Sequence, residues 1–437
     1  MSWFCQSIGS SFVTFFSQKL FNKLELLLQS FQSFSQLLTG IILFKFIYYP
    51  YCFVDLSLFV YYFFNYLLYK YVVNKIYIII NIEKFMLNIA LLTWNCGNQI
   101  VSNEDILIII EKILNISSRS PELIAIGIQE ARGARPDKNN SITVRIKKEL
   151  NKKLSNIASY EIASIEYISG MTKLNEAINH QELGVIYQKD ISLEKIIVRN
   201  KKVRQSISGK GGIISTFKLK DINISLITAH LDSFSPKIRE QQIDDLLKKE
   251  YELNNENNKT ETSDVIFFMG DLNYRLRARV LSSLGINPEC SFSLANALSH
   301  PRLRTYLFVA DTLLESNLIY KYKFEFPKPC FNNIFLPTYK RFFRSEELLD
   351  TFQPFIDYSS DYKMLKILQM SFFNNQARLQ LSHKRRDEID LGWLDRIGFL
   401  IKTSKVRNIK MNSFEDISRV KASDHIPVLM KNVIELI

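Results

Sequence analysis

The sequence predicts a mixed α/β fold in which two β-sheets pack face to face and helices cover their outer faces. From residue 86 onward, short apolar runs rich in β-branched and aromatic residues alternate with segments whose apolar residues recur at helical spacing. Between residues 161 and 229 the strand-like runs follow one another closely, which indicates antiparallel hairpins. A two-sheet sandwich fits this spacing better than a doubly wound parallel sheet.

The expected elements follow from these patterns in chain order. Strand-like runs lie at residues 87–93, 122–128, 161–168, 183–187, 192–199, 212–219, 222–229, 264–269, 396–402 and 426–430. Helical patterns lie at residues 104–114, 143–153 and 237–249. Asn103 is the predicted cap of the first helix, and Ser235 with Pro236 are the predicted cap and first residue of the third. The polar run 254–263 and the long excursion 341–392 are predicted loops.

The first 85 residues differ in composition from the rest of the chain. They hold 14 of the 32 Phe and 9 of the 20 Tyr, but only nine charged residues. Between Ile41 and Ile80 the longest stretch without a charge, Leu56–Tyr69, has 14 residues, which is short of the ~20 that a spanning helix needs. The sequence therefore predicts an N-terminal extension at residues 1–85 and a separate domain at residues 86–437.

Three interpretations of the extension stay open. It is a membrane anchor, as a hairpin or an interfacial segment, since Tyr and Phe favour the headgroup layer. Alternatively it is translated non-coding sequence, with the protein starting at Met86, or a soluble helical extension. It lacks the charged start and the small-residue cleavage site of a signal peptide. Mass spectrometry of the endogenous N-terminus tests whether the protein starts at Met86. A protein that begins at Met86 has no anchor.

Charge and cysteine content narrow the partners. Residues 86–437 carry nine of the twelve excess positive charges, which suits a polyanionic partner: a phosphorylated small molecule, an anionic membrane surface or nucleic acid. Charge alone does not choose among these partners. The five cysteines have no paired or zinc-binding spacing, which favours a reducing compartment. A cytoplasmic, membrane-associated protein is the expectation.

Several of the predicted apolar strands are followed directly in the chain by residues with polar side chains. In the clearest case, Gly270 closes an apolar run and is followed by Asp271, Asn273, Tyr274 and Arg275. Taken singly, such residues have ordinary explanations as caps, turns or salt bridges. Together they predict an active-site rim, because buried strands hold the groups that follow them in fixed positions. The other strand ends supply Asn95, Glu130, His230, Asp395 with Arg396, and Asp424 with His425.

Eight motifs occur in a fixed order: TWNCGN at 93–98, IQE at 128–130, KGG at 210–212, AHL at 229–231, GDLNYR at 270–275, PTYK at 337–340, WLDRI at 393–397 and SDHIPV at 423–428. In these motifs, residues 86–431 resemble the catalytic domain of inositol polyphosphate 5-phosphatases, within the wider DNase I-like fold of endonucleases, exonucleases and phosphatases. Related nucleases typically lack PTYK, the Tyr-Arg after GD-x-N, and the tryptophan before DRI. The resemblance implies a four-layer α/β sandwich.

The residue types suit hydrolysis of a phosphate ester, whose negative charge must be neutralised before water attacks. Glu130 is a hard oxygen ligand of the kind that Mg²⁺ takes in ones or twos. Asn95 is predicted to add a carbonyl oxygen or to orient Glu130, and Asp424 to bind the metal or its waters. The expected cofactor is Mg²⁺ rather than zinc.

The predicted catalytic residues surround the reacting phosphate. Asp271 and Asn273, two apart on one extended segment, are expected to face the same side and to orient or deprotonate the attacking water. His425 is expected to stabilise the developing charge, with Asp395 holding its tautomer and favouring the imidazolium. The resemblance implies that His230 also contacts the scissile phosphate.

The resemblance also implies a set of substrate-binding residues. In the family, the Tyr and Lys of PTYK contact the neighbouring 4-phosphate, and Tyr339 and Lys340 match them. The remaining predicted substrate contacts from the matched motifs are Lys210, Tyr274, Arg275 and Arg396.

Some positions depart from the family pattern. The family's Lys-x-Arg upstream of the tryptophan is replaced, because Asp387 and Ile389 stand there, although the basic residues Lys384, Arg385 and Arg386 lie shortly before. An ordinary solvated surface is the plainer interpretation of this basic run. Further departures are Gly209, Leu391, Leu394 and Ile426. They bear on substrate preference more than on activity.

Three functions are therefore compared. The first is a Mg²⁺-dependent phosphatase that removes the 5-phosphate from a phosphoinositide lipid, such as phosphatidylinositol 4,5-bisphosphate, or from a soluble inositol polyphosphate. The second is a phosphodiesterase of the same fold, a nuclease or a sphingomyelinase, which PTYK and Tyr274-Arg275 disfavour, so that no nucleic-acid partner is expected. The third is an inactive phosphoinositide-binding module. The presence of Asp271 argues against it, because a protein that only binds gains nothing from a residue that orients water.

Overall fold

The computed structural model describes residues 70, 86–114, 120–132, 141–155, 158–171, 177–189, 198–205, 209–255, 262–287, 307–327, 338–339, 388, 392–417, 419–420 and 422–437. The predictions for the extension at residues 1–85, for Lys340 and for residues 384–386 lie outside this set. One compact unit comprises Leu87–Ile116 and Pro121–Ile437, and the fold below is that of its described residues. No helix in the described ranges is both long enough and apolar enough to cross a membrane.

The first sheet has six strands in the order β10-β11-β1-β2-β4-β3. Its central strands β1 and β2 run parallel, and helix α4 (Asn103–Leu114) lies between them in the chain. The β2–β4, β3–β4 and β10–β11 pairs are antiparallel. The strand bounds are β1 Met86–Asn95, β2 Leu123–Arg132, β3 Tyr160–Met171, β4 Ala177–Gln188, β10 Val406–Asp416 and β11 Val428–Leu436.

The second sheet has five strands in the order β5-β6-β7-β8-β9. Strands β7 and β8 are parallel, with helix α6 (Pro236–Asn255) between them in the chain, and the other neighbouring pairs are antiparallel. The strand bounds are β5 Arg199–Arg204, β6 Gly211–Leu219, β7 Ile222–His230, β8 Val265–Asp271 and β9 Asp395–Ile401.

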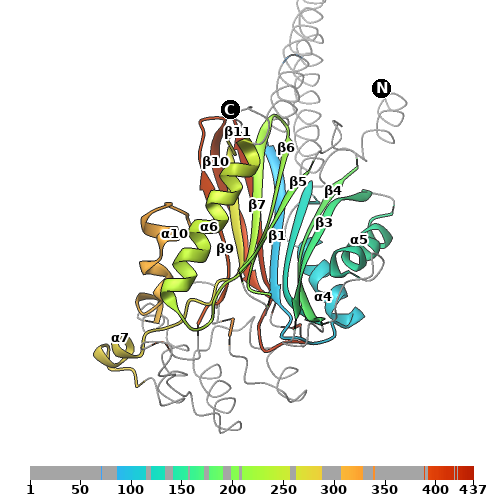
Figure 1. Cartoon of the computed structure of the whole chain (residues 1–437). Coiled ribbons are helices and arrows are strands. Elements are labelled where there is room, and N and C mark those ends of the chain that lie inside the picture. Colours follow the sequence, from blue (N-terminus) through green and yellow to red (C-terminus); the bar gives the residue numbers. More distant parts are fainter. Residues whose placement is uncertain are drawn as a thin grey trace, which may run out of the picture. The chain divides into compact units, whose positions relative to one another are not determined.

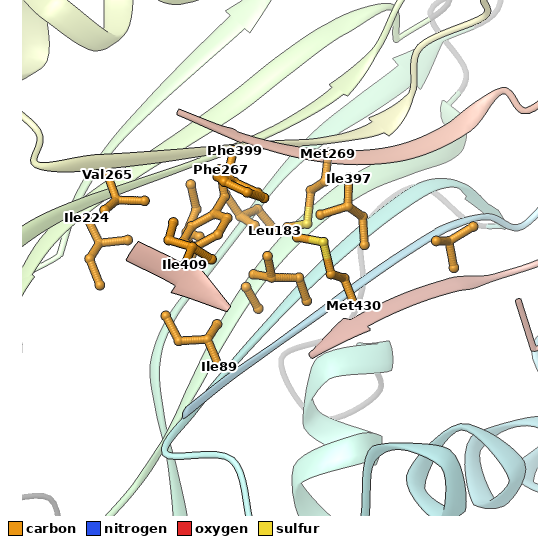
Figure 2. Packing of buried hydrophobic residues seen from close by; sticks show 14 of the residues in the cluster. Ile89, Leu183, Ile224, Val265, Phe267, Met269, Ile397, Phe399, Ile409 and Met430 are labelled. Atoms are coloured by element: carbon orange, nitrogen blue, oxygen red, sulfur yellow. The ribbon is translucent and has the colours of Figure 1, made fainter. Parts of the chain in front are cut away.

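The two sheets bury a common apolar core, because alternate residues of each strand face the opposite sheet. Ile89 and Leu183 of the first sheet and Val265 and Phe267 of the second belong to one cluster, as Figure 2 shows. Burial of such side chains contributes roughly 1.5–3 kcal/mol each. This core fixes the distance between the sheets, and thereby between the groups at their ends.

Helices cover the outer face of each sheet (Figure 1). Helices α4 and α5 (Ile142–Lys153) pack their apolar residues on the first sheet, where Ile109 and Ile146 meet Leu92 and Trp94. Helix α6 packs on the second sheet through Ile243 and Leu246. Three shorter helical elements follow β8 in the chain: α7 Ala278–Ser283, η1 Thr312–Glu315 and α10 Asn317–Tyr320. The predicted four-layer α/β sandwich is confirmed.

The boundaries show where sequence reasoning differs from the structure. Nine of the ten predicted strands overlap an observed strand by several residues. Of the predicted run 192–199, residues 192–197 lie outside the described residues, and Arg199 is the first residue of β5. Asn103 is not the cap of α4, because the Ser102 hydroxyl accepts from the Asp105 amide (3.0 Å) while the Asp105 carboxylate accepts from the Ser102 amide (3.1 Å). Ser235 does cap α6, with its hydroxyl 3.3 Å from the Ile238 amide. Strand β10 was not predicted.

Candidate active site

The inward-facing rows of the core end in polar side chains at one end of the sandwich. In β7 the inward row runs through Ile224 and Leu226 to Thr228 and His230, and in β8 it runs through Phe267 and Met269 to Asp271. A period of two therefore carries the apolar rows directly into the candidate site. The polar groups stand on the same rigid layer as the core residues that precede them.

The second sheet places three of these groups side by side. His230 is the register partner of Asp271 in the parallel β7–β8 pair, and Asp271 is the partner of Asp395 in the antiparallel β8–β9 pair. Neighbouring strands lie about 4.8 Å apart, so these side chains are held close by backbone pairing alone. All three are almost fully buried.

Asn95 joins the two sheets at this end. Its Nδ2 donates to Asp271 Oδ2 at 2.8 Å, and its Oδ1 accepts from the Gly97 amide at 2.9 Å. The prediction that Asn95 orients Glu130 by its side chain is not met, because its amide nitrogen contacts Asp271 instead. Asn95 therefore fixes the carboxylate of Asp271 from across the sandwich.

Glu130 reaches the same cluster through an irregularity in β2. The β2–β4 register shifts between Ile128 and Ala131, and Glu130 has a φ of +49°. Such a backbone conformation costs on the order of 1–2 kcal/mol for a residue with a Cβ. It brings Glu130 Oε1 to 3.3 Å from His230 Nε2, which also lies 3.4 Å from Asp271 Oδ2.

Asp271 is surrounded by cationic and donor groups. Burial by itself raises the pKa of a carboxyl group, but the hydrogen bond from His230 and the charges of His425, His230 and Lys210 outweigh it. The pKa of Asp271 is therefore held below its usual value, and the side chain is a carboxylate at neutral pH.

His425 and Asp395 form the second half of the cluster. His425 Nδ1 lies 2.8 Å from Asp395 Oδ2, and both side chains are buried. Although burial lowers the pKa of a histidine, the carboxylates of Asp395, Asp271 and Asp424 prevail and raise the pKa of His425 to about 9. His425 is therefore an imidazolium at neutral pH, as the pairing with Asp395 predicts.

Two hydroxyl groups that the sequence did not single out support this pair. The Ser423 hydroxyl donates to the Asn95 carbonyl at 2.7 Å and accepts from the His425 amide at 3.0 Å. The Thr338 hydroxyl accepts from the Asp395 amide at 3.0 Å. Both belong to matched motifs, so their motif membership was the only available signal.

Tyr339 and Arg275 lie beside His425. The Tyr339 ring is 4.5 Å from the His425 ring, and the Arg275 guanidinium carbon is 4.9 Å from the Tyr339 ring centroid. Tyr339 also forms a bridge with Gly392, just before Trp393. Of the two predicted substrate contacts, Tyr339 thus lies against His425, and Arg275 lies against Tyr339.

Asn273 is positioned differently from the prediction. Strand β8 ends at Asp271, and Asn273 has a φ of +55°, so the two residues do not share an extended segment. The Asn273 amide instead donates to Asp271 Oδ1 at 3.1 Å in a tight turn. Its side chain is fixed by Leu231, whose carbonyl accepts at 3.0 Å, and by Arg275, which donates at 3.2 Å.

Lys210 and Asp424 complete the rim. Lys210 Nζ contacts His230 Nε2, and burial lowers its pKa while Asp271 and Glu130 oppose that change. Asp424 packs against Gly97, where a Cβ would lie 2.9 Å from its Oδ1. Both residues are therefore close to the cluster.

Tyr274 and Arg396 are not brought to the cluster. The Tyr274 hydroxyl donates to Glu240 of α6 at 2.7 Å, and its side chain belongs to the core beneath that helix. Arg396 is buried in an ion pair with Asp311. As the neighbour of Asp395 on β9, Arg396 faces the opposite side of the sheet. Their placement does not support the prediction that they bind substrate.

The donor set fits a hard divalent cation. Within the described part of the chain, no three His, Cys, Asp or Glu side chains form a metal-binding group by themselves. Mg²⁺ does not require such a group, because it keeps several waters and takes one or two carboxylates from the protein. Burial raises the pKa of Cys96 well above its usual value, so this residue offers no thiolate. Glu130, a predicted ligand, offers a carboxylate in the cluster, with its Oε1 3.3 Å from His230 Nε2.

Gly270 makes the approach of β7 and β8 possible and provides a test of the geometry. Its φ is +137°, and a Cβ there would lie 1.9 Å from the Ala229 carbonyl oxygen. We expect Gly270→Ala to lower the free energy of unfolding by at least about 2 kcal/mol, measured by urea denaturation.

Gly285→Ala is the matched control, since Gly285 also has a positive φ (+76°) but would place its Cβ in open space. It should cost only about 1 kcal/mol. Equal losses in the two variants would contradict the close approach at Gly270.

The chain matches one family model and is similar to several solved structures. The Endonuclease/Exonuclease/phosphatase family 2 model matches residues 92–354, more than half of the chain. No curated protein matches the chain. Among solved structures, the inositol polyphosphate 5-phosphatase domain of SpSynaptojanin, in complex with inositol (1,4)-bisphosphate and calcium ion, is 17% identical. That match covers 84% of this chain and 91% of that one, with a TM-score of 0.49.

Two other solved structures are also similar to the chain, the second of them more distantly. Cimex nitrophorin in its ferrous NO complex is 18% identical over 80% of this chain and 99% of that chain, with a TM-score of 0.48. TDP2 from Caenorhabditis elegans is 13% identical over 80% of this chain and 74% of that chain, with a TM-score of 0.34.

A DNase I-like sandwich with carboxylates and histidines gathered at one end of its two sheets defines a class of hydrolases. Enzymes of this fold typically use a divalent metal. The chain belongs to the Endonuclease/Exonuclease/phosphatase family 2.

Proposed function

We propose that the protein hydrolyses the 5-phosphate of a phosphoinositide or of a soluble inositol polyphosphate, with Mg²⁺ as cofactor. The observation that carries this proposal is the position of Tyr339, whose ring lies 4.5 Å from that of His425. The PTYK motif distinguishes the 5-phosphatases from related nucleases, and a residue that reads the headgroup must stand beside the group that acts on the phosphate. The excess of positive charge suits an anionic membrane surface as the place of action.

The residues of the cluster divide the work of the reaction. Water attacks phosphorus, the bond from phosphorus to the inositol oxygen breaks, and inorganic phosphate leaves while the inositol hydroxyl takes up a proton. Asp271 is a carboxylate with a lowered pKa, so it is a weak base, and its role is to orient the attacking water. Little proton removal is needed, because phosphoryl transfer proceeds through a loose transition state.

The cationic groups act on the phosphate. The His425 imidazolium, held by Asp395, donates a hydrogen bond to a phosphoryl oxygen or to the leaving oxygen. Lys210 and His230 supply further donors on the opposite side of Asp271. A divalent cation held at Glu130 supplies charge neutralisation of the phosphoryl group when bound.

Phosphate release tests the proposal directly. Residues 86–437 and the full chain are incubated with phosphatidylinositol 4,5-bisphosphate in vesicles and with soluble inositol polyphosphates. We expect release of inorganic phosphate that requires Mg²⁺ and stops with EDTA, because a dianionic monoester needs charge neutralisation.

The same assay separates the competing functions. Cleavage of abasic DNA or sphingomyelin without release of phosphate from inositol substrates would make the protein a phosphodiesterase. Vesicle binding without Mg²⁺-dependent turnover would make it a binding module. Either result contradicts the proposed function.

A further inference from the structure

Two consecutive side chains of β2, Gln129 and Glu130, face the interior of the sandwich. In a regular strand successive side chains alternate, and Ile128 packs outward against the helices, so Gln129 faces inward and Glu130 should face outward. The register shift places Gln129 and Glu130 together opposite a single residue, Gln181, of β4. This bulge turns Glu130 back toward His230.

Backbone hydrogen bonds join the bulge to the residues that follow β1. The Cys96 amide donates to the Gln129 carbonyl at 2.7 Å, and the Asn98 amide donates to the Glu130 carbonyl at 2.8 Å. These bonds hold the chain of β2 beside the end of β1. They do not fix how far Glu130 lies from the second sheet.

The Gln129 side chain spans the gap between the sheets. Its Nε2 donates to Thr228 Oγ1 at 3.0 Å, and its amide also lies 3.4 Å from Thr93 Oγ1. Both Gln129 and Thr228 are fully buried. A Cβ at Gly127 would lie 2.6 Å from Thr228 Oγ1, so a glycine at that position is what lets the Thr228 side chain come close to β2.

The two inter-sheet contacts form successive rungs. Thr228 and His230 are two residues apart on the inward face of β7, and their partners Gln129 and Glu130 are consecutive in the bulge. The Gln129–Thr228 rung lies one step deeper in the core than the Glu130–His230 rung. Displacement of the deeper rung therefore moves the outer one, because both partners are carried by the same two backbone segments.

We propose that Gln129 is a positioning residue, whose hydrogen bond to Thr228 sets the place of Glu130 and thereby the affinity for the divalent cation. The inference rests on the proposed function only in assuming that Glu130 binds this cation. It assigns to Gln129 a role in cation binding that requires no contact with cation or substrate. Partners that orient a metal ligand typically change metal affinity about 10- to 100-fold when they are removed.

The test measures cation binding without turnover. Mn²⁺ replaces Mg²⁺ as a paramagnetic probe, and its free concentration is followed by electron paramagnetic resonance during titration of the 86–437 protein and the full chain. Gln129→Met keeps the length of the side chain and removes the amide, and Thr228→Val removes the partner hydroxyl. Each is expected to weaken Mn²⁺ binding about 10-fold or more, and the double variant should be little weaker than either single one.

A matched control separates positioning from loss of stability. Gln242 is a buried glutamine on α6 whose Oε1 accepts from the Asp232 amide at 2.7 Å, so its side-chain bond is made away from Gln129 and Thr228. Gln242→Met is expected to lower the melting temperature but to leave Mn²⁺ affinity unchanged. Gln129→Asn, whose shorter amide cannot reach Thr228, should resemble Gln129→Met.

The outcomes are distinguishable. Unchanged Mn²⁺ affinity in folded Gln129→Met and Thr228→Val, with a wild-type protein that binds Mn²⁺, would overturn the positioning role alone. A wild-type protein that binds no Mn²⁺ would overturn the proposed function and this inference together. Equal weakening in Gln242→Met would reduce the effect to stability, and would also overturn the positioning role.

Discussion

Asp271→Asn is expected to lower kcat by about 10³-fold or more while the protein stays folded. The substitution keeps the shape of the side chain but removes the charge that orients the attacking water. Asn95 Nδ2 donates to Asp271 Oδ2, and His230 Nε2 lies 3.4 Å from the same oxygen. The other oxygen, Oδ1, accepts from the Asn273 backbone amide at 3.1 Å. An amide has only one acceptor oxygen and cannot serve both groups of donors, so the orientation of the water is lost as well as the charge. Steady-state release of inorganic phosphate with Mg²⁺ measures the effect.

Asp264→Asn provides the matched control at the opposite end of the same strand. Asp264 directly precedes β8, whereas Asp271 ends it, and it is equally buried. It accepts from the Asn223 amide at 2.7 Å and from the Thr403 hydroxyl at 2.5 Å, far along the strand from the cluster. This variant should lose stability but keep its kcat per folded molecule. Near-normal turnover in Asp271→Asn would remove Asp271 from the mechanism.

The alternation of strands explains why much of the site was predictable. Asn95, His230, Asp271 and Asp395 each continue an inward apolar row, so a sequence pattern of period two places them on one face before any contact is known. The same rule places Arg396 on the other face, since it follows Asp395 directly. The motif resemblance alone suggested otherwise, and the physical rule was the better guide.

Other features of the structure could not be predicted from a regular pattern of apolar and polar residues. The bulge that turns Glu130 inward and the turn at Asn273 both place a residue at a positive φ. This conformation is rare for Glu, and Asn adopts it more readily, so Asn273 alone offered a weak local signal. Strand β10 was missed because its residues are mostly polar and exposed, as suits an edge strand. Thr338 directly precedes the isolated bridge between Tyr339 and Gly392, so its contact with Asp395 depends on tertiary structure alone.

Asp395→Asn is expected to lower kcat by about 10²- to 10⁴-fold. The activity that the variant retains should also have a different pH dependence. In the wild type, the pKa of His425 is raised from 6.5 to about 9, with Asp395 the largest cause that raises it. If the imidazolium is the active form, activity falls as the pH rises through about 9. Without the carboxylate, the alkaline limb of the kcat profile should move down toward neutral pH, because less negative charge favours the imidazolium.

The raised pKa of His425 also predicts how the stabilisation from the His425–Asp395 pair depends on pH. A folded-state pKa above the unfolded value means that the folded protein holds the proton more tightly, so the stabilisation is fully present below about pH 6.5. It is lost as the pH rises through about 9. Urea denaturation across this range should therefore show a decline in wild type that is smaller in Asp395→Asn and absent in His425→Ala.

Asp311→Asn separates the charge at Asp395 from a general effect of removing a buried carboxylate. Asp311 is as buried as Asp395 and pairs with Arg396, the next residue on β9, but on the opposite face of the sheet. Breaking that pair should cost stability without moving the alkaline limb, because the carboxylates that raise the pKa of His425 are those of Asp395, Asp271 and Asp424. If Asp311→Asn and Asp395→Asn shift the limb equally, the raised pKa of His425 does not come from its 2.8 Å contact with Asp395. If neither shifts it, the alkaline limb belongs to another group, and His425 acts on the phosphate in its neutral form.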